Sequence, residues 1–206
     1  MVRRRHIRVF RRSEDGTTLV EGLLVFPILL MVFAALIEFG FAVFQWNQAV
    51  KAVQLGARLA AVSDPLPEDM SALTADYGGS NEGEATNEAW VTVSCGAGEA
   101  ACNPARLNRL IYGSDGACDA DYGTSLPGMC DFNPSIRPSN VRISYHRSGL
   151  GYVGRPWGPV VTVTLELDGL TFNLPFMGAL LGINNMTIPA HPVTVTSEDL
   201  CSQVSC

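Results

Sequence analysis

The chain has 206 residues, with 14 basic and 20 acidic side chains and a formal net charge of -6. This length allows one or two modest domains, and the acidic balance gives no reason to expect nucleic-acid binding. Hydrophobic residues make up 47% of the chain and charged residues 17%, which excludes a mainly disordered protein and indicates a segment that does not belong in water.

Charge is divided unevenly along the chain. Residues 1–15 carry six arginines against two carboxylates, whereas residues 64–206 carry six arginines against sixteen carboxylates. A basic start, an apolar run and an acidic remainder are typical of a protein that spans a membrane once. The early arginines predict a cytoplasmic N-terminus and a C-terminal region outside the cytoplasm.

The apolar run begins close to the N-terminus. Residues 22–37 carry no charge and are bounded by Glu21 and Glu38. About 20 apolar residues cross a bilayer core of about 30 Å, and residues 19–43 supply that length, with Trp46 following as an interfacial aromatic. The alternatives are a buried core helix and a cleaved signal peptide, whose apolar region of about 7–15 residues precedes a small-residue cleavage site.

The helix is expected to continue beyond the membrane. Polar side chains form one helical stripe at Asn47, Lys51, Gln54 and Arg58. Asp64-Pro65 stops the helix, because the residue before a proline avoids the α conformation. We therefore predict one helix over residues 17–62, kinked at Pro27. Its small outer residues favour packing, either against the chain's own C-terminal domain alone or also against other subunits.

Glu21 is unusual because a carboxylate at the edge of the hydrocarbon costs free energy and is commonly paired or functional. One interpretation is a side chain that reaches the cytoplasmic interface, where Arg11 and Arg12 are available. Another comes from its context. Gly16-Thr-Thr-Leu-Val-Glu21 followed by an apolar run resembles the processing site of type IV prepilins.

That resemblance implies that a prepilin peptidase cuts between Gly16 and Thr17. The basic leader, residues 1–16, would be discarded on the cytoplasmic side, and Glu21 would stand fifth in the mature chain. The new amine at Thr17 would need a counter-charge in a lipid-embedded helix bundle, and Glu21 of a neighbouring subunit can supply it. Glu38 is either a second carboxylate that pairs across subunits or a marker of the outer interface, and its depth favours the interface.

Further motifs extend the resemblance along the helix. Those motifs are Asp15-Gly16 through Glu21, Phe26-Pro27, Ile37-Glu38-Phe39-Gly40, and Gln48-Ala49 through Gly56-Ala57-Arg58. They are similar to the TadE-like family, the pilin-like proteins of the Tad (tight adherence) machinery, over about residues 14–62. Gly22 departs from the family, which often has an aromatic residue after the glutamate.

The family resemblance implies a non-catalytic minor pilin or pseudopilin of a Flp-type pilus, which helps to initiate, prime or cap the filament. Its expected location is the inner membrane, with the C-terminal domain periplasmic or extracellular. The implied partners are other pilin-like subunits, the prepilin peptidase, inner-membrane platform proteins and the lipid bilayer. The alternative is an uncleaved, membrane-anchored periplasmic structural or binding protein.

The remainder of the chain has a different character. The sequence predicts a linker over residues 63–88 and a β-rich extracytoplasmic domain over residues 89–206. Alternating hydrophobic side chains predict strands over residues 89–94, 141–145 and 161–167 and around Val193 to Val195, and helical spacing occurs over residues 105–112. The expected fold class is therefore α+β, with a long N-terminal helix followed by a small antiparallel sheet domain, as in pilins.

An apolar run without charge also lies near the C-terminus, over residues 170–183. Similar runs occur between the last two strands of TadE-like chains. It is either a loop with a short helix that covers the core or an exposed patch that touches the bilayer or a partner.

All six cysteines lie beyond the predicted span: Cys95, Cys102, Cys118, Cys130, Cys201 and Cys206. An even number outside the cytoplasm favours disulfides. The sequence does not select among the fifteen pairings that six cysteines allow, and we take the local pairs Cys95–Cys102, Cys118–Cys130 and Cys201–Cys206 as the working hypothesis.

No known catalytic motif is present, and no cofactor or metal is expected. Zinc is disfavoured because there is no C-x-x-C pair and no nearby histidine pair. Asp115, Asp119 and Asp121 could supply oxygen ligands to Ca²⁺, but a solvated acidic loop is the favoured interpretation. Asp69 and Ser71 begin an adhesion-type metal motif that fails at Leu73.

Overall fold

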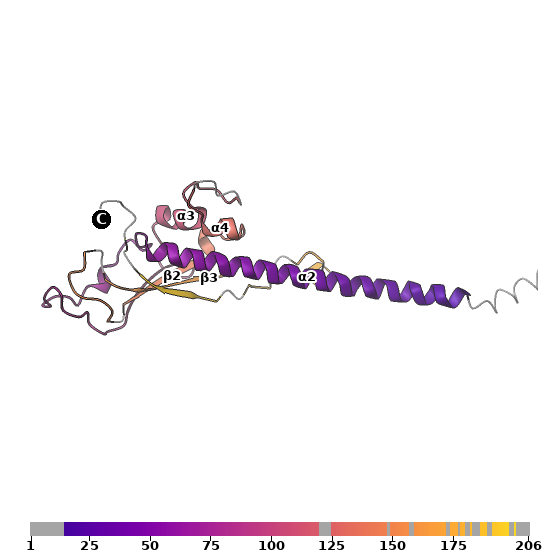
Figure 1. Cartoon of the computed structure of the whole chain (residues 1–206), viewed down its shortest axis with the longest axis horizontal. Coiled ribbons are helices and arrows are strands. Elements are labelled where there is room, and N and C mark those ends of the chain that lie inside the picture. Colours follow the sequence, from indigo (N-terminus) through magenta and orange to yellow (C-terminus); the bar gives the residue numbers. More distant parts are fainter. Residues whose placement is uncertain are drawn as a thin grey trace, which may run out of the picture. The chain divides into compact units, whose positions relative to one another are not determined.

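The computed structural model describes residues 15–119, 125–147, 149–156, 159–171, 174–176, 178–179, 182, 186–188, 191–197 and 200. The chain divides into two compact units, residues 1–43 with 173–184, and residues 44–172 with 185–206. One long helix, α2 (Asp15–Ala61), contributes to both units (Figure 1). The predicted helix over residues 17–62 is therefore present, with its end one residue earlier, before Asp64-Pro65.

In the first unit, α2 is an apolar helix with an exposed surface. Its large apolar side chains from Leu19 to Phe39 are between 48% and 69% exposed. Pro27 lies inside the helix. The helix is continuous through this proline, whose missing N–H removes one backbone hydrogen bond.

The second unit contains a four-stranded antiparallel sheet in the order β1-β2-β3-β4. The strands are β1 (Val91–Gly96), β2 (Val141–Arg147), β3 (Thr162–Leu167) and β4 (Val193–Thr196). The register pairs Val93 with Tyr145 and Val163 with Val195. All four strands predicted from alternation are therefore present.

One face of the sheet is buried because its side chains alternate as a pleated strand requires. In β2, every second residue is fully buried from Val141 to Arg147, and the intervening residues are half-buried. In β3, Val163 and Leu165 are buried in the same layer. This face and the second half of α2 enclose the hydrophobic core.

The second half of α2 separates small buried residues from polar exposed ones. Ala49, Ala52, Val53, Ala57 and Ala60 have no exposed surface, and the predicted polar stripe at Lys51, Gln54 and Arg58 faces solvent. The predicted packing of α2 against the chain's own domain is thus confirmed.

Gly56 lies where α2 packs closely against the side chains of Met129 and Leu165. A Cβ atom at this position would lie 2.6 Å from Sδ of Met129 and 3.2 Å from Cδ1 of Leu165. These distances are shorter than ordinary van der Waals contact between carbon atoms. A side chain at residue 56 would therefore require the Met129 and Leu165 side chains to shift.

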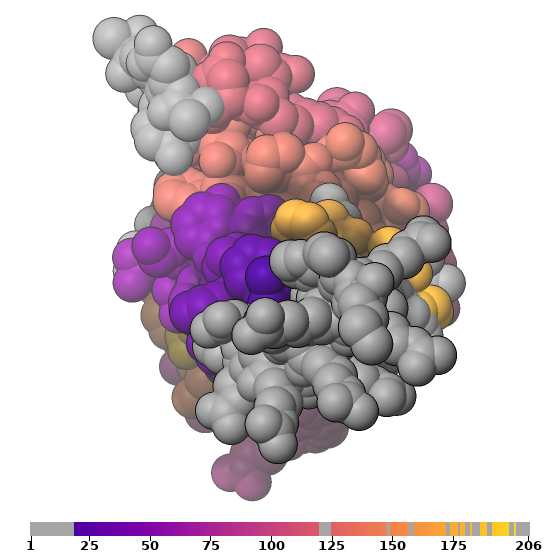
Figure 2. Space-filling model, turned by 90° about the vertical axis from the view of Figure 1, so that its right-hand side faces the viewer, coloured from indigo at the N-terminus to yellow at the C-terminus, as the bar shows by residue number. Residues whose placement is uncertain are grey.

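The second unit also contains two short helices (Figure 1): α3 (Pro104–Tyr112) and α4 (Met129–Phe132). Asn103 caps α3, because its side-chain oxygen accepts hydrogen bonds from the N–H groups of Ala105 and Arg106. The predicted helix over residues 105–112 is thus present. The α3–α4 region forms a continuous pink-to-salmon surface in Figure 2.

Gly113 ends α3 with a φ of 69°, and a Cβ there would lie 2.3 Å from the carbonyl oxygen of Leu126. Glycine tolerates both the positive φ and the close approach.

The predicted linker, residues 63–88, packs on the sheet domain. It contains one short 3₁₀ helix, η1 (Ser71–Leu73), and buries Leu66 and Leu73 completely or almost so. The backbone N–H of Leu66 donates to the hydroxyl oxygen of Tyr145, and burial raises the pKa of Tyr145 to about 12. A second 3₁₀ turn, η2 (Pro138–Asn140), leads into β2.

Candidate membrane and assembly surface

Among the described residues, one helical segment is long and apolar enough to cross a membrane, over Leu19–Ala61. None of its most apolar stretch is buried. A core helix of a water-soluble domain would bury that stretch, because exposed apolar surface costs about 25 cal/mol per Å² in water. The exposed surface therefore disfavours the core-helix alternative.

Glu21 lies inside this exposed apolar surface. Its side chain is exposed, and Val20, Leu24 and Val25 beside it on the helix are exposed as well. No described residue of the chain forms an ion pair or hydrogen bond with its carboxylate. The predicted cleavage position, Gly16–Thr17, lies in the first turn of α2. The carboxylate is therefore open to a partner from outside the described part of the chain.

Glu38 has the opposite surroundings. It is only 3% exposed, although Ile37 and Phe39 on either side of it are 67% and 69% exposed. Its Oε1 accepts a hydrogen bond of 2.9 Å from the backbone N–H of Phe176. Glu38 is thus engaged by its own chain, whereas its predicted interface or cross-subunit role stays a prediction.

The two carboxylates are separated along the helix rather than brought together. Glu38 stands 17 positions after Glu21, which corresponds to about 26 Å at 1.5 Å per residue. Glu21 and Glu38 therefore mark opposite ends of the apolar run, one exposed and one covered.

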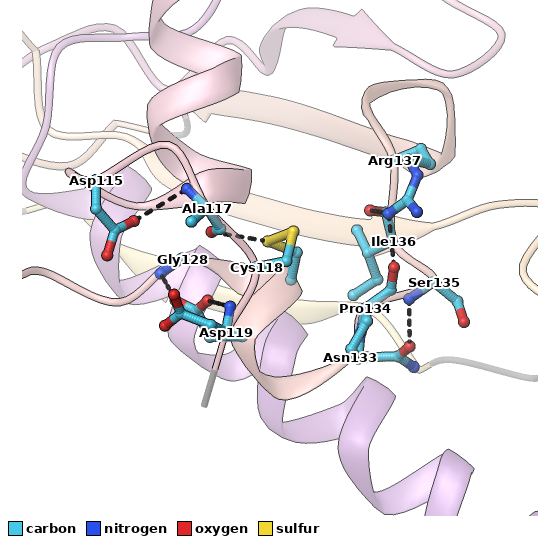
Figure 3. The surroundings of a disulfide bond; sticks show 12 residues. Asp115, Ala117, Cys118, Asp119, Gly128, Asn133, Pro134, Ser135, Ile136 and Arg137 are labelled. Carbon is cyan, nitrogen blue, oxygen red and sulfur yellow. Dashed lines mark hydrogen bonds between the residues drawn. A yellow bond between two sulfur atoms is a disulfide. The ribbon is translucent and has the colours of Figure 1, made fainter. Parts of the chain in front are cut away.

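Two disulfides join neighbouring segments of the second unit. Cys95 in β1 pairs with Cys102, and Cys118 pairs with Cys130 in α4 (Figure 3). Both predicted local pairs are confirmed. Cys201 and Cys206 lie outside the described residues, so their pairing stays a prediction. Disulfides persist in oxidising compartments, which agrees with a domain outside the cytoplasm.

Carboxylates near the second disulfide close backbone turns. Asp131 accepts hydrogen bonds from the N–H groups of Asp119 and Gly128, at 3.0 and 2.7 Å. Asp115 accepts from the N–H of Ala117 (Figure 3). Asp121 lies outside the described residues. In the part of the chain that the structure describes, no three His, Cys, Asp or Glu side chains are grouped to hold a metal ion.

The start of the adhesion-type motif is also a turn. Asp69 Oδ1 accepts a hydrogen bond of 2.8 Å from the N–H of Ser71, which opens η1. This hydrogen bonding with Ser71 lowers the pKa of the exposed Asp69. The carboxylate therefore closes a local turn.

Two histidines lie beside aromatic rings. Nδ1 of His146 is 2.8 Å from the hydroxyl of Thr92, and its ring centroid is 5.1 Å from that of Trp90. His191 is 6.5 Å from Trp46 by the same measure. Neither contact forms a metal-ligand set among the described residues.

A cleft of about 560 Å³ opens where the end of α2 meets α3. Its apolar wall includes Leu59, Leu110 and Leu126, and Arg106 and Arg109 lie at the same cleft. Arg106 donates to the carbonyl oxygen of Pro65. The lining residues include no histidine or cysteine; the expectation that the protein is not an enzyme stays a prediction.

A long apolar helix and a disulfide-containing antiparallel sheet define an α+β protein. The family model described as "TadE-like protein" matches residues 16–58, which include Gly16, Glu21, Glu38 and Gly56. The resemblance predicted from the motifs is confirmed over this N-terminal region. Comparisons with curated proteins and with solved structures gave no match.

The contact between Glu38 and Phe176 could not be predicted from the sequence. The charge-free run over residues 170–183 indicated an unusual segment. No local signal linked its backbone to a glutamate 138 positions earlier.

Proposed function

We propose that the protein is a minor pilin or pseudopilin of a Tad (Flp-type) pilus assembly system and helps to initiate, prime or cap the filament. The observation that carries this proposal is the exposed Glu21 within an exposed apolar helix surface. The family match over the same residues supports it. A carboxylate placed in this way is costly in lipid unless it meets a counter-charge.

The counter-charge in this proposal comes from processing. The prepilin peptidase cleaves after Gly16 and removes the basic leader on the cytoplasmic side of the inner membrane. The new amine at Thr17 is a cation, and Glu21 of a neighbouring subunit binds it within the helix bundle. A charge-assisted hydrogen bond of this kind is stronger than a neutral one and acts in a low dielectric.

The second unit occupies the extracytoplasmic side in this proposal. Its two disulfides suit an oxidising compartment. The small buried residues of α2, with Gly56 among them, hold the sheet domain on the helix. The exposed apolar half of the helix is left for lipid, for other pilin-like subunits and for the platform proteins.

The decisive experiment is to measure the intact mass and the N-terminal sequence of the protein purified from its native membrane. A mature chain that begins at Thr17 is the expected result, and the full leader should be retained in cells that lack the prepilin peptidase. A chain that keeps residues 1–16 in both strains would contradict processing. It would instead favour an uncleaved, membrane-anchored periplasmic protein.

A further inference from the structure

The connection between β3 and β4 carries an apolar tip. Its base is closed by pairing of Thr171 with Thr187 and by a hydrogen bond of 2.6 Å from the N–H of Ile188 to the carbonyl oxygen of Leu170. Residues 173–184 beyond this base belong to the same compact unit as residues 1–43. The tip of a loop from the sheet domain thus lies with the apolar part of α2.

One hydrogen bond fixes where the tip meets the helix. The backbone N–H of Phe176 donates to Oε1 of Glu38 at 2.9 Å, and Glu38 is 3% exposed. The tip is closed on itself by a hydrogen bond of 3.1 Å from the N–H of Gly178 to the carbonyl oxygen of Leu174. Glu38 therefore holds the backbone of the tip, while the Phe176 side chain is 62% exposed.

The position of Glu38 along the helix gives its depth in a membrane. Glu38 stands 19 positions after Leu19, or about 28 Å at 1.5 Å per residue, close to the bilayer core of about 30 Å. Glu38 then lies at the outer boundary of the hydrocarbon. A carboxylate at this boundary is stabilised by a hydrogen-bond donor that removes it from lipid contact.

The chemistry of the tip fits the same depth. Residues 170–183 contain no charged side chain. Exposed aromatic side chains follow Glu38 on α2 at Phe39, Phe41 and Phe44. Trp and Tyr are enriched at the boundary between hydrocarbon and headgroups, and helices that lie in this layer bury phenylalanine and leucine side chains in it. An exposed phenylalanine held beside Glu38 is suited to that layer.

We propose that the tip around Phe176 is a second membrane-contacting element, which inserts the Phe176 ring into the outer interfacial layer of the bilayer. Glu38 is its positioning residue. The inference rests on the membrane placement in the proposed function and adds to it a lipid contact made by the connection between β3 and β4.

The test uses the full-length protein in phosphatidylcholine vesicles whose acyl chains are brominated near the headgroup. Bromine quenches tryptophan fluorescence only at short range. Three aromatic replacements are compared with the parent protein: Phe176→Trp at the tip, Phe33→Trp inside the apolar run and Tyr152→Trp on the sheet domain. The measured quantity is the quenching of the added fluorescence relative to vesicles of unbrominated lipid.

We expect strong quenching of the added tryptophan in Phe176→Trp and Phe33→Trp and none in Tyr152→Trp. Combining Phe176→Trp with Glu38→Leu should remove most of the quenching at the tip. Combining it with Glu38→Gln should retain it, because the amide oxygen still accepts the hydrogen bond. This rescue separates a positioning role from a general requirement for folding.

Two outcomes would overturn the proposal. Quenching of Phe33→Trp without quenching of Phe176→Trp would show an inserted helix with a tip outside the lipid, including a tip reserved for a neighbouring subunit. Absence of quenching in Phe33→Trp as well would refute the membrane placement itself. The two failures are therefore distinguishable.

Discussion

Arg147 at the end of β2 forms a two-pronged ion pair with Asp76 of the segment that follows α2. Nη1 lies 2.5 Å from Oδ1, and Nη2 lies 2.7 Å from Oδ2. The arginine side chain is completely buried, and its guanidinium lies 5.4 Å from the ring centroid of Tyr77. The pair joins the predicted linker to the sheet across 71 positions of sequence.

The Asp76–Arg147 pair should matter more for stability than an exposed pair on the same strand. Asp76→Ala leaves Arg147 buried with an unpaired charge, which is strongly destabilising. Glu166→Ala is the control, because Glu166 and Arg142 are each about one-third exposed and such surface pairs contribute little. We expect a clearly lower urea midpoint for Asp76→Ala and almost no change for Glu166→Ala. Equal midpoints would contradict a stabilising role for the pair.

The same pair predicts a dependence of stability on pH. The hydrogen bond from Arg147 lowers the pKa of Asp76 below its ordinary value of 3.8. Because the folded state has the lower pKa, the stabilisation is fully present well above pH 3.8. It is lost as the pH falls from that value through the pKa of the folded state. Urea titrations at decreasing pH should show this acid-dependent loss in the parent and a smaller loss in Asp76→Asn.

Gly56 and Gly40 offer a matched test of close packing on α2. Both are glycines within one helix, where alanine is favoured by about 1 kcal/mol. A Cβ at residue 56 would contact Met129 at 2.6 Å, whereas a Cβ at residue 40 would meet nothing within 4 Å. We expect Gly56→Ala to be less stable than Gly40→Ala by about 1–3 kcal/mol, as for overpacked cores. Urea unfolding in detergent, followed by tryptophan fluorescence, measures the difference.

The local features of this fold were predictable because they depend on short-range patterns. Alternation in residues 161–167 predicted β3, and the polar stripe at Lys51, Gln54 and Arg58 predicted the exposed face of α2. The two disulfides join cysteines 7 and 12 positions apart, so proximity in sequence was a useful guide. The membrane-compatible helix followed from length and charge.

The long-range contacts were not predictable, for a physical reason. Asp76 carries no local mark that distinguishes it from other acidic loop residues, and its partner is decided by how the loop folds back on β2. The same holds for Glu38 and Phe176, since any backbone N–H could serve as the donor. The role of Gly56 depends on which side chains α2 meets, and these come from α4 and β3.

The two disulfides should each stabilise the sheet domain. Closing loops with sequence separations of 7 and 12 reduces the entropy of the unfolded chain and contributes about 2–3 kcal/mol each. The double variants Cys95→Ser with Cys102→Ser and Cys118→Ser with Cys130→Ser should lower the free energy of unfolding by such an amount. Peptide mapping without reductant checks the connectivity, and a crossed pair such as Cys102–Cys118 would refute it.

Glu21 provides the sharpest test of assembly. Glu21→Ala should insert into the membrane normally, because it removes a charge from an apolar surface, and it should be cleaved at Gly16. Its recovery with other pilin-like subunits should fall about tenfold or more, since a charge-assisted hydrogen bond contributes about 1.5–3 kcal/mol. Glu21→Gln keeps the side-chain shape and its hydrogen-bonding oxygen but lacks the charge. If Glu21→Gln loses as much co-purification as Glu21→Ala, the neighbouring amine recognises the negative charge. Unchanged co-purification of Glu21→Ala would refute the role of this carboxylate in assembly.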